Sequence, residues 1–502
     1  MTLINFILQN LSINSLLCFV TSLAAFLYFW KGSRKSAVRM PPGPSPLPII
    51  GNLNVVDLKK PHQSLMELSE KYGDVFTVHF GPKKMVVLAG YETVKDALVN
   101  HADDFGERAH IPIFHRMTRG NGIAFSHGES WKIIRRFALS TLRDFGMGKK
   151  TIEARILDEL QPLIEYFDSH QGKPFDTKVI VNSAVSNVIC SILFGGRFAY
   201  EDPTFLTLLT LLSENAKLLG TPLVLLYNFY PYLGFLFGAQ KKVLKNVEQQ
   251  NVFLQGFFKE HRKEFSANNI TGFIDAYLLK QEQESKNSDT YFHNENLLYS
   301  TLDLFAAGTE TTSTTLRWGL LLMMKYPEIQ KRAQKEIDTV IKPGQVPKVE
   351  DRRNMPYTDA VVHEVQRFAN IIPMSVSRAT STEVHFRGYC IPKGIEVVPL
   401  LTSVLYDKSQ WETPYEFNPS HFLDANGKFL RKDAFIPFAA GRRICVGESL
   451  AKMELFLFFT GLLQRFTFQP PSGVTESDLD LTADVGFLLS PMPHSVCAVA
   501  RA

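Results

Sequence analysis

The stretch FIPFAAGRRICVG, from Phe435 to Gly447, places one cysteine between an arginine pair and a glycine. The 502-residue chain has five cysteines, which are Cys18, Cys190, Cys390, Cys445 and Cys497. Their odd number and wide spacing exclude a disulfide framework, and no Cys-x-x-Cys pair indicates zinc binding or redox exchange. We therefore expect a reducing, cytosol-facing compartment. A cysteine in such a chain is by default a small buried apolar residue, and only Cys445 is set apart by its neighbours.

Composition indicates a globular protein. Hydrophobic residues make up 45% of the chain and charged residues 21%, which are ordinary values. The formal net charge of +4 is too small to indicate a nucleic-acid partner. There is no repeat and no low-complexity tract.

The N-terminal region predicts a membrane anchor. Residues 11–30, LSINSLLCFVTSLAAFLYFW, carry no charge and match the roughly 20 residues of a membrane-spanning helix. Basic residues follow this run, from Lys31 to Arg39, instead of preceding it, which disfavours a cleaved signal peptide and places the bulk of the chain in the cytoplasm. The alternative is a buried core helix. We expect an anchor helix over 1–30, a basic and proline-rich linker over 31–52, stiffened by its prolines, and one body over 53–502.

The body is predicted to be mainly α with a smaller β portion. Helical patterns fill much of residues 130–340 and return at 451–463. Alternating apolar residues around Gly81-Pro82 predict a hairpin, and a second strand region is expected near residues 383–400. No further domain boundary is visible in the body.

The segment LDLFAAGTETTSTTLRWGLLLMMKYP, residues 302–327, predicts an unusual helix, apolar at both ends and polar in the middle. Asp303, Ala307 and Thr311 are spaced by four and share one face. Gly308 costs about 1 kcal/mol relative to alanine in a helix interior, and threonine hydroxyls can bond to the preceding turn and bend a helix. We expect a local opening that holds water, with room beside Ala307 for a bulky flat group. The alternative is an ordinary buried helix.

The segment HEVQRF contains Glu364 and Arg367, which are three residues apart and can pair on one helix. Such pairs are common on protein surfaces and contribute little there. His421, in PYEFNPSHF, could join them as a third member.

These motifs, in this order, resemble those of microsomal cytochromes P450 of the vertebrate family-two type. The proline-rich segment and WKIIRR at 131–136 also match, and DFGMGKK and FTVHFGPKK resemble the K subfamily. The residues that fit the cysteine motif are Phe438, Gly441, Arg443, Cys445 and Gly447. The helix motif falls on residues 307–312, and Glu364 and Arg367 fit the Glu-x-x-Arg motif.

The resemblance implies the cytochrome P450 fold and haem b, iron protoporphyrin IX, with Cys445 as its thiolate ligand, which favours cleavage of the O–O bond. Phe438 would pack beside the sulfur, and Gly441 and Gly447 would let the main chain pass close to the macrocycle. The implied partners of the haem propionates are Trp131, Arg108, Arg135, Arg378 and Arg443. Arg378 stands where many members have histidine, and each arginine has the alternative role of a surface charge.

The resemblance further implies that Glu310 and Thr311 deliver the protons that activation of O2 requires. The implied substrate contacts are Ile111, Ile113, Phe114, Phe305, Ala307, Ile371, Ile372, Val376 and Phe487. All are apolar and suit a lipophilic substrate, although core packing is the alternative for each. The aromatic run at 225–238 would lie at a membrane-facing entrance.

The implied function is that of an unspecific haem-thiolate monooxygenase, inserting one oxygen atom of O2 into fatty acids or xenobiotics. The implied location is the endoplasmic reticulum membrane, with a single span and a cytoplasmic catalytic domain. The chain has no Gly-rich dinucleotide fingerprint and no flavin domain, so electrons from NADPH need a partner: NADPH–cytochrome P450 reductase, with cytochrome b5 as a helper. A basic docking face would comprise Lys132, Arg136, Arg431, Lys432 and Arg442, unless these are solvated charges.

Two other functions stay open. A haem-thiolate isomerase acting on peroxides would need no proton relay, so Glu310 and Thr311 disfavour it. A non-catalytic haem-binding protein would need neither the relay nor an apolar pocket.

Overall fold

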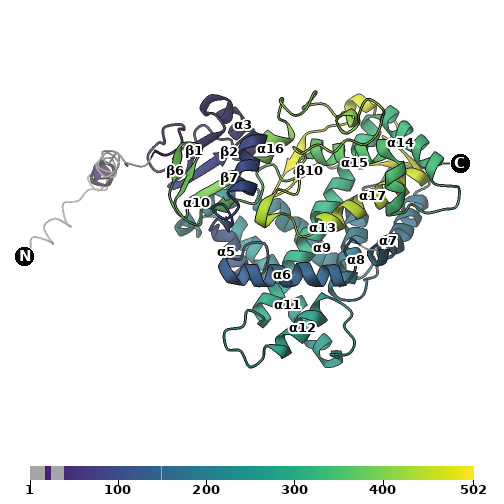
Figure 1. Cartoon of the computed structure of the whole chain (residues 1–502), viewed down its shortest axis with the longest axis horizontal. Coiled ribbons are helices and arrows are strands. Elements are labelled where there is room, and N and C mark those ends of the chain that lie inside the picture. The colour runs from purple at the N-terminus through teal and green to yellow at the C-terminus, as the bar shows by residue number, and fades with distance from the viewer. Residues whose placement is uncertain (1–16, 24–38, 149, 502) are drawn as a thin grey trace, which may run out of the picture.

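The computed structural model describes residues 17–23, 39–148 and 150–501. A helical body fills one side of the molecule, and a smaller sheet portion with β1, β2 and β7 occupies the other, as Figure 1 shows. Helices α11 and α12 project from the body at the bottom of that view. The prediction of a mainly α protein with a smaller β portion is confirmed.

The predicted anchor helix falls largely on residues outside the described ranges. Residues 17–23 are helical and exposed. Among the residues that the structure describes, no helix combines the length and the apolar character needed to cross a bilayer.

The main sheet has five strands in the order β1-β2-β7-β4-β3. The predicted hairpin is confirmed, since β1 and β2 pair antiparallel with Val75 opposite Leu88. Strand β2 pairs parallel with β7, while β4 pairs antiparallel with both β7 and β3. The strand bounds are β1 Val75–Phe80, β2 Lys83–Leu88, β3 Glu107–Arg108, β4 Arg378–Ala379 and β7 Glu396–Pro399.

Both faces of this sheet are buried. Val75, Val86 and Leu88 pack into one apolar cluster, whereas Phe76 and Val87 pack into another. Successive side chains of a strand point to opposite faces, so the two clusters cover the two faces. In β1, Phe76, Val78 and Phe80 all face the second cluster and alternate with Thr77 and His79 on the other face.

The proline-rich segment lies against the sheet. Thr77 in β1 donates its backbone N–H to the Pro42 carbonyl at 2.7 Å and its hydroxyl to the Pro41 carbonyl at 2.9 Å. A Cβ on Gly43 would lie 1.9 Å from the Thr77 carbonyl oxygen, so the close approach requires glycine at that position. Residues 41–43 thus belong to the packed body, while the boundary predicted at residue 52 stays a prediction.

The helical body surrounds α13 (Asn294–Lys325), which packs against α8, α15 and α17. One large apolar cluster joins these helices. The other long helices are α3 Pro61–Tyr72, α6 Gly128–Asp144, α7 Lys150–Ser169, α8 Lys178–Leu193, α9 Pro203–Leu219, α10 Pro222–Phe229, α11 Ala239–Glu264, α12 Phe273–Gln283, α14 Pro327–Val340, α15 Pro356–Ala369 and α17 Glu448–Arg465.

Short elements complete the fold. Helices α4 Tyr91–Lys95, α5 Pro112–Thr118 and α16 Leu401–Leu405 lie near the sheet elements in the chain, and residues 96–100 form one π-helical turn. The second strand region is confirmed as β5, β6 and β7, whereas the C-terminal strands were not predicted. These strands are β5 Val384–Phe386, β6 Tyr389–Ile391, β8 Phe466–Gln469, β9 Ala483–Val485, β10 Leu489–Pro491 and β11 Cys497–Ala500.

The local opening predicted in α13 is wrong for the backbone, because the helix runs without interruption through its polar centre. A Cβ on Gly308 would lie 3.2 Å from Cγ1 of Ile189 in α8, so glycine at this position lets the two helices pack closely. The Thr311 hydroxyl donates to the Ala307 carbonyl at 2.7 Å, and Thr315 bonds to the Thr311 carbonyl at 2.9 Å. These bonds to the preceding turn satisfy the hydroxyls inside an intact helix.

Candidate active site

The segment around Cys445 forms a tight loop that leads into α17. The Cys445 N–H donates to the Phe438 carbonyl at 3.2 Å. Gly441 has φ +72°, and a Cβ there would lie 1.7 Å from the Leu98 carbonyl oxygen, so only glycine fits. Gly447 differs, since its φ is −92° and a Cβ would meet only the Cys445 sulfur, at 3.9 Å. Gly441 is thus required by the close approach of Leu98, whereas the described protein does not require glycine at position 447. The passage of both glycines beside the macrocycle stays a prediction.

The Cys445 sulfur lies inside the molecule, where burial raises the pKa of the thiol. Hydrogen bonds from the backbone N–H groups of Gly447 and Glu448, and the positive charge of Arg135, act in the opposite direction and favour the thiolate. The side chain nevertheless keeps accessible surface, so packed side chains do not cover the sulfur. This arrangement suits a metal ligand better than a core cysteine.

Four arginines gather near this loop. Burial and the charges of Arg443 and Arg135 lower the pKa of Arg378 to about 9. Burial and the charge of Arg108 lower the pKa of Arg443 to about 8, and burial with the charges of Arg378 and Arg135 lowers the pKa of Arg108 well below its usual value. Like charges at close range inside a protein are destabilising unless an anion compensates them.

Several donors in this cluster have no partner within the described part of the chain. The Arg443 Nε donates to the Gly106 carbonyl at 3.0 Å and its Nη2 to the Ser126 carbonyl at 2.9 Å, while its Nη1 has no partner. Trp131 Nε1 and Arg378 Nε are likewise buried without a hydrogen-bond partner. An unsatisfied buried donor costs about 1–3 kcal/mol. These residues therefore fit a ligand that carries anionic oxygens, and with the Cys445 sulfur they fit a haem with its propionates.

Helix α13 presents Glu310 and Thr311 to different neighbours. The Glu310 carboxylate accepts hydrogen bonds from Ser213 Oγ in α9 at 2.5 Å and from Asn182 Nδ2 in α8 at 3.2 Å. Burial raises the pKa of Glu310. Thr311 bonds to the Ala307 carbonyl instead, and Ala307 is exposed although most of its helix is buried. The space expected beside Ala307 is thus present.

An apolar cavity of about 160 Å³ lies between the sheet, α10 and the loop before α5. Phe114 stacks on Phe125 with ring centroids 3.8 Å apart and meets the edge of Phe487 at 5.7 Å. The predicted substrate contacts that line the cavity are Ile111, Ile113, Phe114, Ile372, Val376 and Phe487. Phe305, Ala307 and Ile371 do not line it, and Phe305 packs in the helical core, 6.5 Å from the Phe194 ring.

The sequence profile described as "Cytochrome P450" matches residues 41–498. The chain belongs to the cytochrome P450 family.

Relatives place this P450 within the vertebrate family 2. It is 52% identical to cytochrome P450 2K1 of Oncorhynchus mykiss over 504 residues, covering 100% of both chains. It is 52% identical to cytochrome P450 2K6 of Danio rerio, over 91% of this chain and 90% of the relative. It is 46% identical to cytochrome P450 2F2 of Mus musculus, over 92% and 94% respectively. Family membership makes this P450 a haem-thiolate monooxygenase that uses O2, a redox partner and a lipophilic substrate.

The sequence analysis assigned no role to Asp303 of this P450. An acidic residue in an apolar stretch of helix could have indicated a buried polar contact. Its Oδ2 accepts the backbone N–H groups of Ile123 and Ala124 at 2.7 and 2.9 Å. Burial raises the pKa of Asp303 to about 6. The Ala124 carbonyl in turn accepts from Arg108 Nε at 2.9 Å. Asp303 therefore ties the loop before α6, and through it Arg108, to α13.

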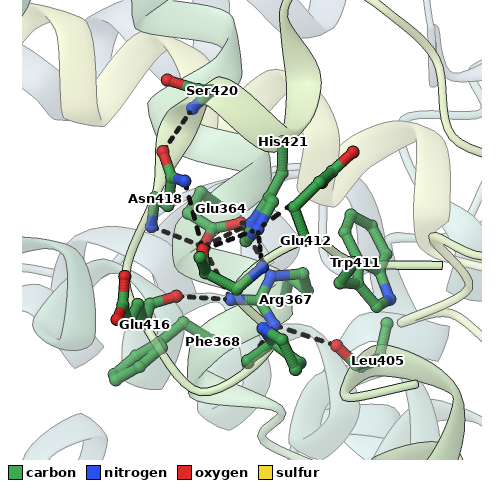
Figure 2. A network of polar contacts seen from close by, with 12 residues as sticks. Glu364, Arg367, Phe368, Leu405, Trp411, Glu412, Glu416, Asn418, Ser420 and His421 are labelled. Atoms are coloured by element: carbon green, nitrogen blue, oxygen red, sulfur yellow. Dashed lines mark hydrogen bonds and ion pairs between the residues drawn. The ribbon is translucent and has the colours of Figure 1, made fainter. Parts of the chain in front are cut away.

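The P450 also buries the ionic cluster that the sequence suggested (Figure 2). Glu364, Arg367 and His421 converge, with Arg367 Nε and Nη2 donating to the Glu364 carboxylate at 2.8 and 2.7 Å. His421 Nδ1 lies 3.2 Å from both carboxylate oxygens. The pair of Glu364 and Arg367 is fully buried, unlike the surface pairs that the motif alone would indicate.

Arg367 uses all of its hydrogen-bond donors. Besides Glu364, it donates from Nη1 to the carbonyls of Leu405 and Pro414 at 2.9 and 2.7 Å, and from Nη2 to the Glu416 carbonyl at 2.8 Å. A guanidinium has five N–H groups, and these five bonds satisfy each of them. The cluster thereby connects α15 to the segment that follows α16.

Proposed function

We propose that this P450 is a monooxygenase of the endoplasmic reticulum membrane that inserts one oxygen atom of O2 into fatty acids or xenobiotics. We further propose that its electrons come from NADPH through NADPH–cytochrome P450 reductase. The observation that carries the proposal is the Cys445 thiol, which packed side chains leave uncovered, near a set of buried donors without partners on Trp131, Arg378 and Arg443. The thiol suits a metal, and the unpaired donors suit anionic groups. A ligand that carries both fits the whole arrangement.

In this proposal Cys445 holds the haem iron, while Arg443, Arg378 and Trp131 hold the propionates, assisted by Arg108 and Arg135. When bound, the haem supplies O2 binding and oxidation of the substrate. The N–H groups of Gly447 and Glu448 limit the basicity of the sulfur, a contribution of the kind that tunes metal sites.

Glu310 and Thr311 are proposed as the proton relay. A raised pKa lets Glu310 keep a proton closer to neutral pH, where an acid catalyst is most useful. Thr311 donates its own proton to the Ala307 carbonyl, so the lone pairs of its oxygen remain available to accept a hydrogen bond from a water. Glu310 would supply the proton and Thr311 would position that water.

Substrate preference is proposed from the cavity lining. Most of its residues are apolar or aromatic, including Phe80, Phe229 and Phe487. The polar residues at its wall include Lys83 and Glu396, which form an ion pair with each other. A lipophilic molecule gains free energy when it leaves water for such a cavity.

The surface along α6 supports docking of an acidic redox partner. A groove of about 660 Å³ is lined by Lys132, Arg135, Arg136, Arg143 and Arg442, with Asp144 as its only acidic residue. Clustered charge of one sign steers an oppositely charged protein. Of the residues predicted for this face, Arg431 and Lys432 do not line the groove, and Lys432 pairs with Glu412 at 3.2 Å. Cytochrome b5 is proposed as a second partner for the same face.

The test is turnover by the full chain in lipid vesicles with reductase and NADPH. Medium-chain fatty acids and a panel of lipophilic compounds would be supplied, with products identified by mass spectrometry. We expect Glu310→Gln to lower turnover by about 10²-fold or more, while Glu295→Gln, an exposed acid in the first turn of the same helix, leaves it unchanged. Product formation from peroxides without NADPH, unaffected by Glu310→Gln, would contradict the proposal.

A further inference from the structure

The hairpin of β5 and β6 carries three metal-ligating residue types on its outer face. His385 in β5 is directly opposite Cys390 in β6 in the antiparallel register, and directly opposed side chains lie on the same face. Glu383 lies two residues before His385, and the period of a strand places it on that face as well. Val384 and Phe386, on the other face, are buried.

The ligand atoms of this trio are close to the geometry that one ion requires. One ligand atom from each of Glu383, His385 and Cys390 lies within 4.8 Å of the other two. Bonds of about 2.0–2.3 Å in a tetrahedral site put neighbouring ligand atoms about 3.3–3.7 Å apart. Glu383 and His385 are exposed, so small rotations of their side chains close the difference.

We propose that Glu383, His385 and Cys390 bind one zinc ion. A thiolate, an imidazole and a carboxylate are the three ligand types that zinc takes in proteins, whereas calcium and magnesium prefer oxygen alone. Three protein ligands leave the fourth position to water. Binding replaces the thiol proton, so that Zn²⁺ and Cys–SH give a zinc thiolate and one released H⁺.

The site is separate from the residues proposed to hold the haem. Figure 1 shows β6 at the sheet side of the molecule, away from α13 and α17. The buried face of the hairpin packs Phe386 edge-on against Phe105 and His101, each at 5.3 Å between ring centroids. Zinc would therefore fix the hairpin on its outer side without contact with Cys445, and its binding can be measured whether or not the enzyme turns over.

The test uses the full-length, haem-loaded protein and follows the Cys390 thiol by peptide mass spectrometry after brief alkylation. We expect chelator-buffered zinc to slow alkylation of Cys390 by about tenfold or more, and a chelator to restore it. Zinc content after removal of free metal should be one equivalent per chain. His385→Ala should weaken zinc binding by about 100-fold or more, because even loss of an outer partner of a zinc ligand costs about 10–100-fold.

Two further variants make the result decisive. Glu383→Gln should weaken protection, and His170→Ala, which changes a histidine in the turn that follows α7, should leave it unchanged. The carbon-monoxide difference spectrum shows that each variant retains its haem site. The proposal is overturned if zinc does not protect Cys390, or if protection survives His385→Ala, since the thiol would then bind zinc alone.

Discussion

Replacement of Arg367 by lysine would test how the buried ionic cluster stabilises this P450. Lysine keeps the positive charge but offers three donors in place of five. Arg367 now donates five hydrogen bonds, to acceptors on Glu364, Leu405, Pro414 and Glu416. At least two of these bonds would be lost in the lysine variant. Each unsatisfied buried acceptor costs about 1–3 kcal/mol, so the expected loss is about 2–6 kcal/mol.

The assay is thermal unfolding of the haem-loaded enzyme. For a body of about 460 residues, an unfolding entropy of about 2.1 cal/mol/K per residue makes 1 kcal/mol equivalent to about 1 °C in Tm. Arg367→Lys should therefore lower Tm by about 2–6 °C. The same exchange at Arg119, in the exposed pair with Glu295, should change Tm by less than about 1 °C, because exposed pairs contribute about 0–1 kcal/mol. Equal shifts for the two variants would refute the assignment of stability to the buried donors.

Three other changes have definite expected results. Cys445→Ser should abolish both the red-shifted carbon-monoxide spectrum and NADPH-dependent oxidation, and survival of either would contradict the proposed iron ligand. Gly441→Ala should prevent formation of a haem-binding protein, because its Cβ would lie 1.7 Å from the Leu98 carbonyl oxygen, whereas Gly447→Ala should retain measurable haem in the same expression test. Burial raises the pKa of Asp303 from 3.8 to about 6, so the folded chain binds the proton of this carboxyl group more tightly than the unfolded chain does. The contribution of Asp303 to the free energy of unfolding therefore falls by about 3 kcal/mol as pH rises from about 4 to about 6. The Tm of Asp303→Asn relative to wild type should accordingly rise across that range, and a constant difference would count against a buried, titrating Asp303.

The sequence predicted those features that depend on residue type at short spacing. The loop around Cys445 follows from the glycine, the arginine pair and the cysteine within ten residues, and the β1–β2 hairpin follows from Gly81-Pro82 between apolar runs. A helix was predicted over residues 302–327 and is observed over Asn294–Lys325. The reason for Gly308 was not predicted, because close packing against Ile189 is a contact between distant segments.

Contacts between segments far apart in the chain also account for what was missed. Nothing near Asp303 in the sequence indicates the N–H groups of Ile123 and Ala124, about 180 residues away. Cys390 was expected to be an ordinary apolar residue, since only the strand register brings it opposite His385. The depth at which Glu364 and Arg367 are buried likewise depends on the whole fold and not on their spacing of three.

The relay role proposed for Glu310 gives its hydrogen bond with Ser213 a consequence for the timing of catalysis. Ser213 belongs to α9, and Leu219, at the C-terminal end of the same helix, lines the apolar cavity. A ligand large enough to displace α9 would lengthen or break the hydrogen bond that holds the carboxyl group. We therefore expect the size of the bound molecule to govern how readily Glu310 rotates, so that large and small ligands differ in the fraction of electrons that end in product and not in hydrogen peroxide.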